Sequence, residues 1–255
     1  MLARNFSISK KKIIMLESKT IKFKILTIFP SLVSGYFSNP KKGVIARAVF
    51  DGKIKIDEVN LRDFAFDKHK TTDDRMFGGG PGMVMKIEPI FFALKSIIGE
   101  KEIMEKINSK RKKVSELKKE GRIIIGLDAR GKKLTQNLAF KLSKFQEIIV
   151  ICGRYQGIDE RVLESLTDIN IRIGDSIVSG GESLAIPLIE SVSRLIPGVL
   201  GNEESIENET FTKGGFPVYT HPREFFGMRI PEVLLSGDHK KIDEFRKSFT
   251  NKKTK

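Results

Sequence analysis

The sequence predicts an α/β fold built on a parallel sheet with helices on both faces. Runs of β-branched residues of strand length alternate along the chain with stretches of helical periodicity, and this alternation is typical of parallel sheets. Two of these apolar runs stop abruptly at glycine-containing loops that are followed by helix-like patterns. With 255 residues, of which 40% are hydrophobic, the chain is also long and apolar enough to bury a sizeable core.

The predicted strands share β-branched residues and either a period of two or a continuous apolar run. They span residues 22–29, 53–59, 122–127, 147–152 and 170–173. The predicted helices share apolar residues at helical spacing and contain proline only near their start, where it is tolerated. They span residues 44–51, 87–98, 135–143 and 184–196.

Two stretches between these elements have a different character. Residues 61–82 are polar and glycine-rich without periodicity, which predicts a long loop, and loops of that length in compact domains are usually functional. Residues 100–120 are almost all Lys and Glu with a thin apolar stripe, which predicts a solvated surface insertion.

The ends of the chain set the predicted domain organisation. Residues 1–21 are basic and predict a disordered extension, with an organellar transit peptide or a later translation start as alternatives. Residues 22–200 form the main domain, and residues 201–215, acidic and then glycine-bearing, predict a flexible interdomain linker. Residues 216–255 predict a short C-terminal domain with one or two helices, at about 231–235 and 239–249.

The charge balance favours a polyanionic partner. The formal net charge is +14 and the pI is about 9.7, and each phosphate that Lys or Arg neutralises releases condensed counterions. Part of the lysine excess accompanies many Ile and Asn residues and indicates a compositional bias, so the alternative of a merely basic protein stays open.

Few residues are suited to metal or redox chemistry. Cys152 is the single cysteine, which excludes an intrachain disulfide and favours a cytosolic, cytoplasmic location. At the end of an apolar strand, it is expected to be a small buried hydrophobe. The three histidines are widely spaced and predict no metal site, although a Mg²⁺ requirement stays open. No apolar run is long enough to span a membrane.

The stretch from Ile148 to Gly181 predicts a ligand site. Each half is an apolar run, then a glycine-containing loop, then a helix-like pattern. Glycine at a strand end lets the backbone approach a ligand closely, so two such loops would form a pocket lined by main-chain N–H and C=O groups. That lining suits a nucleoside-like cofactor. Two ordinary strand-to-helix turns remain the alternative.

Four segments of the chain carry a resemblance to a known family. They read DDRMFGGGPGM (73–83), CGRYQGIDER (152–161), IGDSIVSGGE (173–182) and SVSRLIPGVLG (191–201). Together they resemble the signature segments of the bacterial tRNA (guanine-N1)-methyltransferases, in the same order and over most of the chain, from about Lys22 to His239.

The resemblance implies the fold and the reaction of the SPOUT class. It implies a deep C-terminal trefoil knot, which single-sequence reasoning would not predict because knots are rare. It also implies a helical C-terminal domain, which appears here in a shortened form. The implied activity is S-adenosyl-L-methionine-dependent methylation of guanosine-37 at N1 in tRNA, next to the anticodon. The implied assembly is a homodimer with its active site across the subunit interface.

The implied cofactor site lies on the loops that follow the central strands. Its residues are Leu127, Ala129, Gly153, Gly157, Ile173, Gly174, Asp175, Ser176, Ile177, Val178, Gly180 and Gly181. Three positions depart from the family pattern: Ala129 replaces a proline, Gln156 a glutamate and Ser176 an aromatic residue. Main-chain contacts tolerate such changes. Asp175 has the alternative of a simple turn residue.

The implied catalytic residues are Arg194 and Glu209. Methylation at guanine N1 requires a carboxylate to take the N1 proton and a donor to offset charge on O6. Arg194 matches the family's assisting arginine, although a cation at a helix C-terminus also simply complements the helix dipole. Glu209 falls where the family has an aspartate and is one methylene longer, so a reduced rate and a slipped register, onto Glu207, stay open.

The remaining implied residues contact tRNA: Arg75, Gly79, Gly80 and Arg154. The loop at 78–83 lacks the Lys-Ser/Thr of a P-loop, which excludes nucleotide hydrolysis, and a flexible turn is its alternative reading. Two other functions stay open. One is a catalytically weak RNA-binding SPOUT homologue, and the other is a SPOUT methyltransferase acting on ribosomal RNA.

Overall fold

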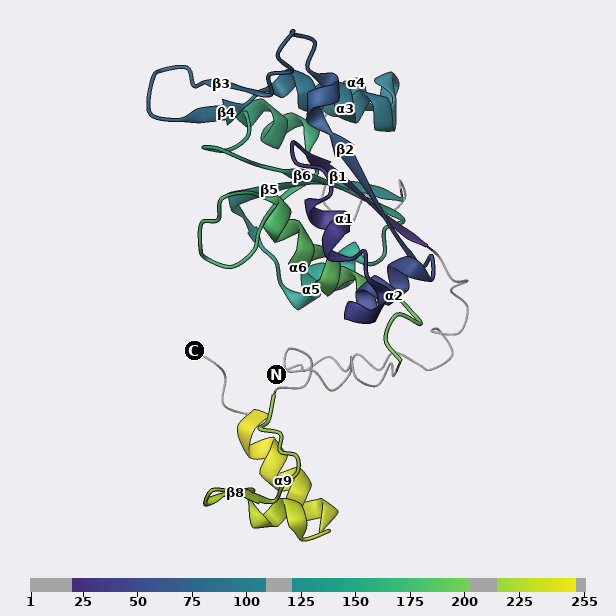
Figure 1. Ribbon diagram of the computed structural model, residues 1–255, viewed down its shortest axis with the longest axis vertical. Helices are drawn as coiled ribbons and strands as arrows, with labels where there is room; N and C mark the ends of the chain where they lie inside the picture. Colours follow the sequence, from purple (N-terminus) through teal and green to yellow (C-terminus); the bar gives the residue numbers. More distant parts are fainter. Residues whose placement is uncertain (1–19, 109–120, 202–214, 251–255) are drawn as a thin grey trace, which may run out of the picture. The chain divides into compact units, whose positions relative to one another are not determined.

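The computed structural model describes residues 20–108, 121–201 and 215–250. Contacts between residues divide the chain into two units, Met1–Leu200 and Gly201–Lys255. The larger unit is built on a five-stranded sheet in the order β2-β1-β6-β5-β7 (Figure 1). All four pairings in it are parallel, which confirms the predicted parallel sheet. The strands are β1 (Ile21–Thr27), β2 (Ile54–Asn60), β5 (Arg122–Lys133), β6 (Glu147–Cys152) and β7 (Ile169–Arg172).

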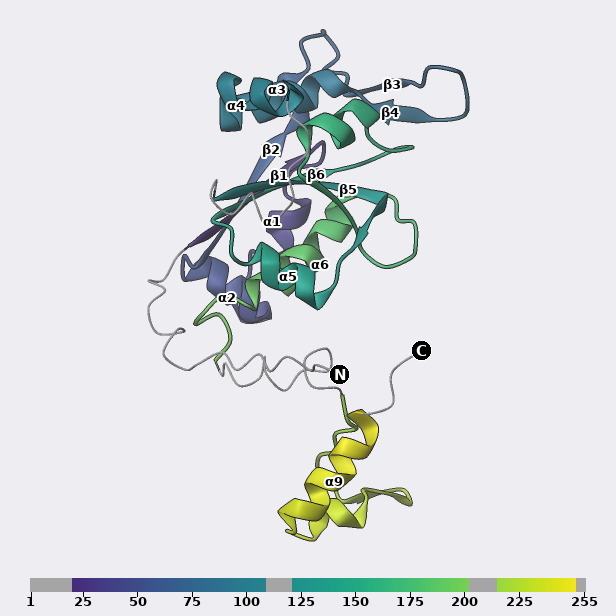
Figure 2. The same cartoon turned by 180° about the vertical axis from the view of Figure 1, so that it is seen from behind.

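Helices cover both faces of this sheet, as Figures 1 and 2 show. One face carries α1 (Leu32–Tyr36), α2 (Val44–Phe50), α5 (Gln136–Leu142) and α6 (Glu182–Ser193). The other carries α3 (Ile87–Ile98), α4 (Glu100–Asn108) and a π-helical segment, Val162–Leu166. Short 3-10 turns, η2 (Pro40–Lys42) and η3 (Leu61–Phe64), join some of these elements.

The two-sided core follows from the period of a strand. In β6, Ile148, Val150 and Cys152 belong to the core on the α6 face, whereas Ile149 and Ile151 belong to the core on the α3 face. Successive side chains of a strand point to opposite faces, so a strand covered on both faces reads as one continuous apolar run. Cys152 is fully buried, as predicted for a small hydrophobe.

Several predicted elements agree closely with the structure. The predicted helix 87–98 is α3 and the predicted strand 147–152 is β6, with the same bounds. β5 differs because it continues six residues past the predicted end, to Lys133. Its register against β7 shifts between Leu127 and Lys132, since both pair with Ile171. The residues between them bulge out of the ladder before the strand rejoins its neighbour.

Two predictions for the polar stretches were wrong in part. The predicted loop 61–82 contains η3 and strand β3 (Asp73–Arg75), which pairs antiparallel with β4 (Met83–Met85). A three-residue polar strand has too few side chains to show a period, so the pattern could not indicate it. α4 is not merely solvated, because Ile103 is fully buried and Lys106 pairs with Asp168. Residues 109–120 lie outside the described part of the chain.

α1 was not predicted from the sequence, because a residue on strand β2 stabilises it. The carboxylate of Glu58, on β2, accepts hydrogen bonds from the N–H groups of Ser31, Val33 and Ser34 at 2.7–3.3 Å. These are donors that a helix start leaves without an intrahelical partner. A residue 24 or more positions away stabilises this five-residue helix, so its own sequence does not predict it.

The smaller unit holds a short hairpin and two helical segments. The hairpin is β8 (Glu224–Phe225) with β9 (Met228–Arg229), and it was not predicted. The expected helix 231–235 is a 3-10 turn, η6 (Glu232–Leu235), and the expected helix 239–249 is α9 (His239–Thr250). The predicted extension at 1–19 and linker at 202–214 lie outside the described residues. No described helix has the length and apolar character required to cross a membrane.

Candidate functional site

Three loops meet at one edge of the sheet. β6, β5 and β7 are neighbours and run parallel, so the segments that follow them emerge together at their carboxyl ends. In open α/β sheets, this edge is where ligands bind. The loop after β6 touches the end of the loop after β7 directly, because Gly181 N–H donates to the Gly153 carbonyl at 2.8 Å. Arg154 and Gly180 form an isolated antiparallel bridge beside it.

Glycines allow these chain segments to approach one another. A Cβ on Gly181 would lie 2.8 Å from Cys152 Cα, and one on Gly131 would lie 2.6 Å from the carbonyl carbon of Asn170. A Cβ on Gly180 would lie 2.2 Å from Nε of Arg154. Gly180 and Gly181 were expected to make room around a cofactor, and in the structure they make room for the protein's own chain.

The loop after β7 exposes its main chain. Residues 174–179 are all exposed, and Ile177 retains 83% of its accessible surface. Within the described part of the chain, the main-chain groups of residues 174–178 form no hydrogen bond to the protein. Because these residues are exposed, their main-chain donors and acceptors face solvent and are accessible to a ligand. Gly174 has φ of +73° and open space where a Cβ would stand.

Asp175 fixes the start of this loop. Its carboxylate accepts hydrogen bonds from Lys133 at 2.8 Å and from Arg172 at 3.0 Å. The hydrogen bond from Lys133, followed by that from Arg172, lowers the pKa of the Asp175 carboxyl. The side chain is therefore engaged with β5 and β7, and it does more than occupy a turn.

The loop within β5 forms another side of the candidate site, next to the loop after β7. Leu127 is almost fully buried, so its side chain belongs to the core, whereas Ala129 is exposed. Arg130 pairs with Asp128 at 3.1 Å and with Glu160 at 2.6 Å, which connects this loop to the segment after β6. The hydrogen bond that Arg130 donates to Asp128, followed by the one that it donates to Glu160, raises the pKa of the Arg130 guanidinium.

The hairpin β3–β4 binds to the loop after β6. Gln156 N–H donates to the Met83 carbonyl at 2.9 Å, and Met85 N–H donates to the Gly157 carbonyl at 2.9 Å. Gly157 has φ of +128°, a conformation that favours glycine. Arg75, Gly79 and Gly80, which the sequence predicts at the tRNA side, are exposed on this hairpin.

Tyr155, in the loop after β6, adopts the left-handed conformation with φ of +58°. Burial, followed by the nearby carboxylate of Asp73, raises the pKa of the Tyr155 phenol. The hairpin and the loop after β6 therefore form one structural body beside the exposed main chain of residues 174–178.

Arg154 is partly buried and pairs with an acidic side chain that the sequence did not single out. Its Nε donates to Glu182 at 2.8 Å, and the Glu182 side chain is only 2% exposed. Arg154 was predicted to contact tRNA. In the structure its guanidinium instead pairs with the carboxylate of Glu182. The available signal for Glu182 was a charged residue at the start of a mostly apolar helix.

The two predicted catalytic residues are not brought together in the described residues. Arg194 is the C-terminal cap of α6 and is half-buried. Glu209 and Glu207 fall in 202–214, outside the described part of the chain. Among the residues that the structure describes, no group of three or more His, Cys, Asp or Glu side chains is arranged to hold a metal ion.

Comparisons with known proteins identify relatives over almost the whole chain. The family model described as tRNA (Guanine-1)-methyltransferase TrmD matches residues 21–255. A tRNA (guanine-N(1)-)-methyltransferase from Sulfurihydrogenibium sp. is 44% identical over 237 residues, which cover 92% of this chain and 84% of that protein. One from Clostridioides difficile is 42% identical over 237 residues, covering 92% of this chain and 94% of that protein.

A solved structure agrees with these sequence matches. The tRNA (m1G37) methyltransferase from Aquifex aeolicus superposes with a TM-score of 0.66 at 36% sequence identity. The match covers 89% of this chain and 87% of that chain.

Proposed function

The chain belongs to the tRNA (guanine-1)-methyltransferase family, and on that premise we propose that it methylates N1 of guanosine-37 in tRNA with S-adenosyl-L-methionine as donor. The observation that carries the proposal is the edge of the sheet at which three loops converge, with the main-chain groups of residues 174–178 exposed and unpaired within the described structure. Such a wall suits the adenine edge and ribose hydroxyls of a nucleoside.

The chemistry of the site fits this cofactor. S-adenosyl-L-methionine supplies an electrophilic methyl group on a sulfonium. The main chain around Gly153, Gly157 and 173–178 would hold it, because backbone donors and acceptors read a nucleoside without a particular side chain. Ala129, Gln156 and Ser176 in place of the family's residues therefore leave the binding wall in place. The ion pairs of Asp175 and Arg130 hold the loops in one geometry.

The protein must also move one proton and offset one developing charge. We assign the base to the carboxylate of Glu209, which would take the N1 proton, and we assign the offsetting cation to Arg194 at the end of α6. General base catalysis contributes roughly 10²–10⁴-fold in rate. The side chain of glutamate is one methylene longer than that of aspartate, so Glu209 would act as the base from a different backbone distance. Arg75, Gly79 and Gly80 on the hairpin would contact the tRNA.

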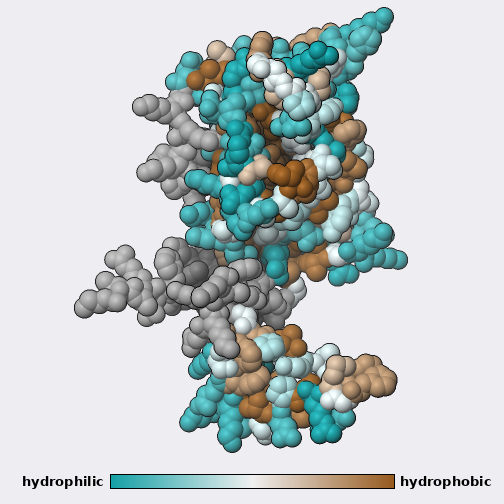
Figure 3. Space-filling model, turned by 90° about the vertical axis from the view of Figure 1, so that its left-hand side faces the viewer, coloured by the Kyte–Doolittle hydropathy of each residue, from teal (hydrophilic) through white to brown (hydrophobic). Residues whose placement is uncertain are grey.

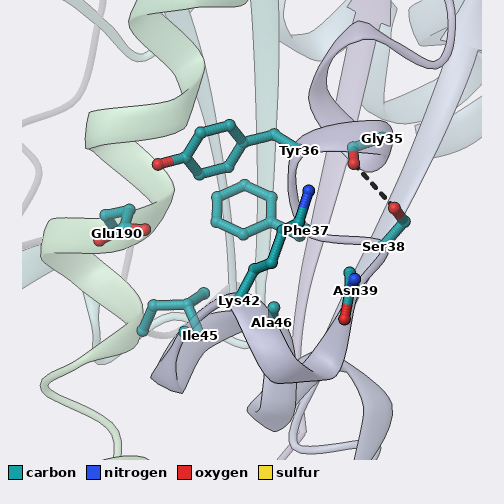
Figure 4. A pocket seen from close by; sticks show the side chains of 10 residues that line it. Gly35, Tyr36, Phe37, Ser38, Asn39, Lys42, Ile45, Ala46 and Glu190 are labelled. Carbon is teal, nitrogen blue, oxygen red and sulfur yellow. Dashed lines mark hydrogen bonds between the residues drawn. The ribbon is translucent and has the colours of Figure 1, made fainter.

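An exposed apolar surface supports assembly as a homodimer. Leu32, Tyr36, Val44 and Phe50, on α1 and α2, retain 47–76% of their accessible surface. Beside them, a groove of about 340 Å³ is lined by residues of α1, η2 and α2, with Glu190 of α6 opposite. Figure 4 shows the rings of Tyr36 and Phe37 between α1 and α6. Figure 3 shows apolar patches among hydrophilic side chains on another view of the larger unit.

In a homodimer, a second copy of the chain would cover the exposed apolar residues of α1 and α2. α6 lies beside this surface and leads to Arg194 and then to the linker that carries Glu209. An active site shared between two subunits would then have its catalytic residues next to the interface.

The trefoil knot, the linker and the tRNA-binding C-terminal domain belong to the same proposal. Close main-chain contact at Gly131 and Gly181 supports a tightly threaded chain at the three loops. The division of the chain at Leu200 supports a separate C-terminal domain, with residues 201–215 as its linker. A substrate that is tRNA supports a cytoplasmic site of action.

Turnover on defined RNA tests the proposed function. The purified chain is incubated with radiolabelled S-adenosyl-L-methionine and a tRNA transcript, and the product is digested to nucleosides. We expect 1-methylguanosine from a transcript with guanosine at position 37 and none from a matched transcript with adenosine there. Binding of that tRNA without methyl transfer would instead favour a catalytically weak RNA-binding homologue. Glu209, which stands where the family has an aspartate, is the reason for testing this alternative. Methylation of ribosomal RNA alone would favour the related SPOUT activity.

A further inference from the structure

The side chains of Arg154 and Glu182 meet where the candidate cofactor loops meet. Arg154 belongs to the loop after β6, and Glu182 is the first residue of α6, directly after the loop that follows β7. Their ion pair, with Nε 2.8 Å from the carboxylate, therefore joins the two segments that would enclose the cofactor. The Arg154 guanidinium also donates to the carbonyl of Ser179 at 3.4 Å.

A third element completes the connection. The other carboxylate oxygen of Glu182 accepts a hydrogen bond at 2.5 Å from the hydroxyl of Thr27, at the end of β1. That hydroxyl in turn accepts a hydrogen bond from the N–H of Phe29 at 3.0 Å. The Arg154 guanidinium lies 4.6 Å from the ring centroid of Phe29, which is a cation–π distance. The network thus spans β1, both loops and the start of α6.

Because Glu182 is buried, the loss of any partner in this network would be costly. Glu182 is 2% exposed and is the one acidic residue in the buried class among the described residues. Removing one partner of such a pair leaves an uncompensated charge away from water, which strongly disfavours the original geometry. The Arg154 side chain is only 21% exposed and its Nε already donates to a carboxylate, so it is poorly placed to bind an RNA phosphate.

The glycine at position 180 fits this arrangement. A Cβ there would lie 2.2–2.7 Å from the Nε, Cζ and Cδ atoms of Arg154. The main chain of the loop after β7 therefore passes directly over the arginine side chain. Both the missing Cβ and the buried acceptor are needed for Arg154 to adopt this position.

From these observations we propose that Arg154 is a positioning residue for the cofactor loops, acting through Glu182 and Thr27, and not a tRNA contact. This inference rests on the proposed function, because the loops that Arg154 holds are the ones assigned to the cofactor. The pair fixes residues 173–181 against 153–157, so that their main-chain groups stand in a binding geometry before the ligand arrives. Misplacement of binding groups by about 1 Å costs on the order of a hundredfold in rate.

The experiment compares the full-length wild-type chain with Arg154→Met, Arg154→Lys, Glu182→Gln and the double variant Arg154→Met/Glu182→Gln. Arg161→Met is the control, because Arg161 lies seven positions further on, is exposed and pairs with Asp159. Calorimetry gives the affinity for S-adenosyl-L-methionine, and hydrogen exchange of the unliganded chain gives the protection of residues 173–181. Filter binding at several salt concentrations gives the tRNA affinity and its salt slope.

We expect Arg154→Met and Glu182→Gln each to weaken cofactor affinity by about tenfold or more and to speed exchange in residues 173–181. The double variant should be no weaker than the worse single variant, because residues that act as a unit are not additive. Arg154→Lys should recover part of the affinity, since it restores the charge. The salt slope of tRNA binding should match that of the wild type, and Arg161→Met should match the wild type in cofactor affinity.

Four results would overturn the positioning role. A salt slope lower by about one in Arg154→Met, with unchanged cofactor affinity, would make Arg154 a phosphate contact. A lower melting temperature alone, with unchanged affinity and exchange below that temperature, would make the pair merely structural. Failure of the wild-type chain to bind the cofactor would overturn the proposed function as well, whereas wild-type binding with unchanged variants would overturn only this inference.

Discussion

Gly181 packs against the main chain at Cys152 so closely that a Cβ at position 181 would lie 2.8 Å from Cys152 Cα. The contact joins the end of β6 to the start of α6, two segments 29 positions apart in the chain. The N–H of Gly181 donates to the carbonyl of Gly153 in the same place. Because the obstacle is main chain and not a flexible side chain, any side chain at this position must displace a strand end.

Gly181→Ala should therefore destabilise the chain and distort the cofactor site. Overpacking of this kind costs about 1–3 kcal/mol in unfolding free energy. Urea unfolding measures the loss, and calorimetry should show weaker S-adenosyl-L-methionine binding. Gly35→Ala is the control, because it lies within α1 with no atom within 4 Å of its Cβ position. It should leave stability unchanged or slightly higher, since alanine favours a helix. Equal stability of Gly181→Ala and the wild type would contradict the packing described here.

Glu209→Gln should lower turnover by roughly a hundredfold or more, within the usual contribution of a general base. The affinity for S-adenosyl-L-methionine should hardly change, because we assign cofactor binding to the glycine loops and not to this side chain. Single-turnover kinetics with a tRNA transcript gives the rate, and calorimetry gives the affinity. Glu209→Asp should retain or raise the rate, since it restores the family's residue.

Glu207→Gln is the control for the register of this assignment. If it abolishes turnover while Glu209→Gln does not, the base lies two positions earlier. If both variants keep the wild-type rate, a carboxylate in this segment is not the base.

Arg75→Ala should weaken tRNA binding and reduce its dependence on salt. Arg75 is exposed at the end of β3, on the hairpin beside the loop after β6. A lost phosphate contact lowers the slope of log affinity against log salt concentration by about one. Binding titrations between about 50 and 200 mM salt measure the slope. An unchanged slope would remove Arg75 from the RNA-binding surface, and a flat salt dependence in the wild type would remove the functional reading of the +14 net charge.

Tyr36→Glu should convert a homodimer into monomers and reduce methylation. It places a carboxylate among the exposed apolar residues of α1 and α2 and close to Glu190, so it would bury a charge beside a like charge in the interface. Sedimentation at micromolar concentration gives the oligomeric state. Phe66→Glu is the control, since Phe66 is 76% exposed but lies against Phe92 of α3, on the other face of the sheet. A wild-type chain that sediments as a fully active monomer would refute the proposed assembly.

Glu147→Gln should destabilise the chain at neutral pH and reduce its sensitivity to acid. Burial alone would raise the pKa of the Glu147 carboxyl, but hydrogen bonds and charge interactions with Arg122 and Lys24 outweigh it and lower that pKa below its ordinary 4.5. The stabilisation is therefore present above pH 4.5 and is lost as the pH falls through the lower folded-state pKa.

Removing this carboxylate should cost about 1–2 kcal/mol at pH 7, as expected for hydrogen bonds to a charged group. Urea unfolding from pH 7 down to pH 3 measures both effects. A wild-type and a Glu147→Gln curve that stay parallel over this range would show that the ion pairs do not carry the acid sensitivity.

The sequence was sufficient wherever a local pattern carried the structure. The parallel sheet followed from strands that alternate with helices along the chain, and α3 and β6 were predicted with the bounds observed. Four motifs in the same order were sufficient to identify the family, and the two around Gly153 and Gly181 predicted a ligand site. Hydrophobic periodicity and glycine spacing depend on neighbours in sequence, so a single chain displays them.

Only the tertiary structure determined the partners that come from distant segments. α1 depends on the Glu58 carboxylate, and the partly buried position of Arg154 depends on Glu182 and on the absence of a side chain at Gly180. The sequence presented Arg154 as a tRNA contact, because its charge alone does not reveal an ion pair with Glu182. An ion pair between residues 28 positions apart exists only once the sheet has brought two loops to one edge. The stability of this ion pair depends on how far the folded chain desolvates and packs the two side chains, and no local sequence pattern shows either.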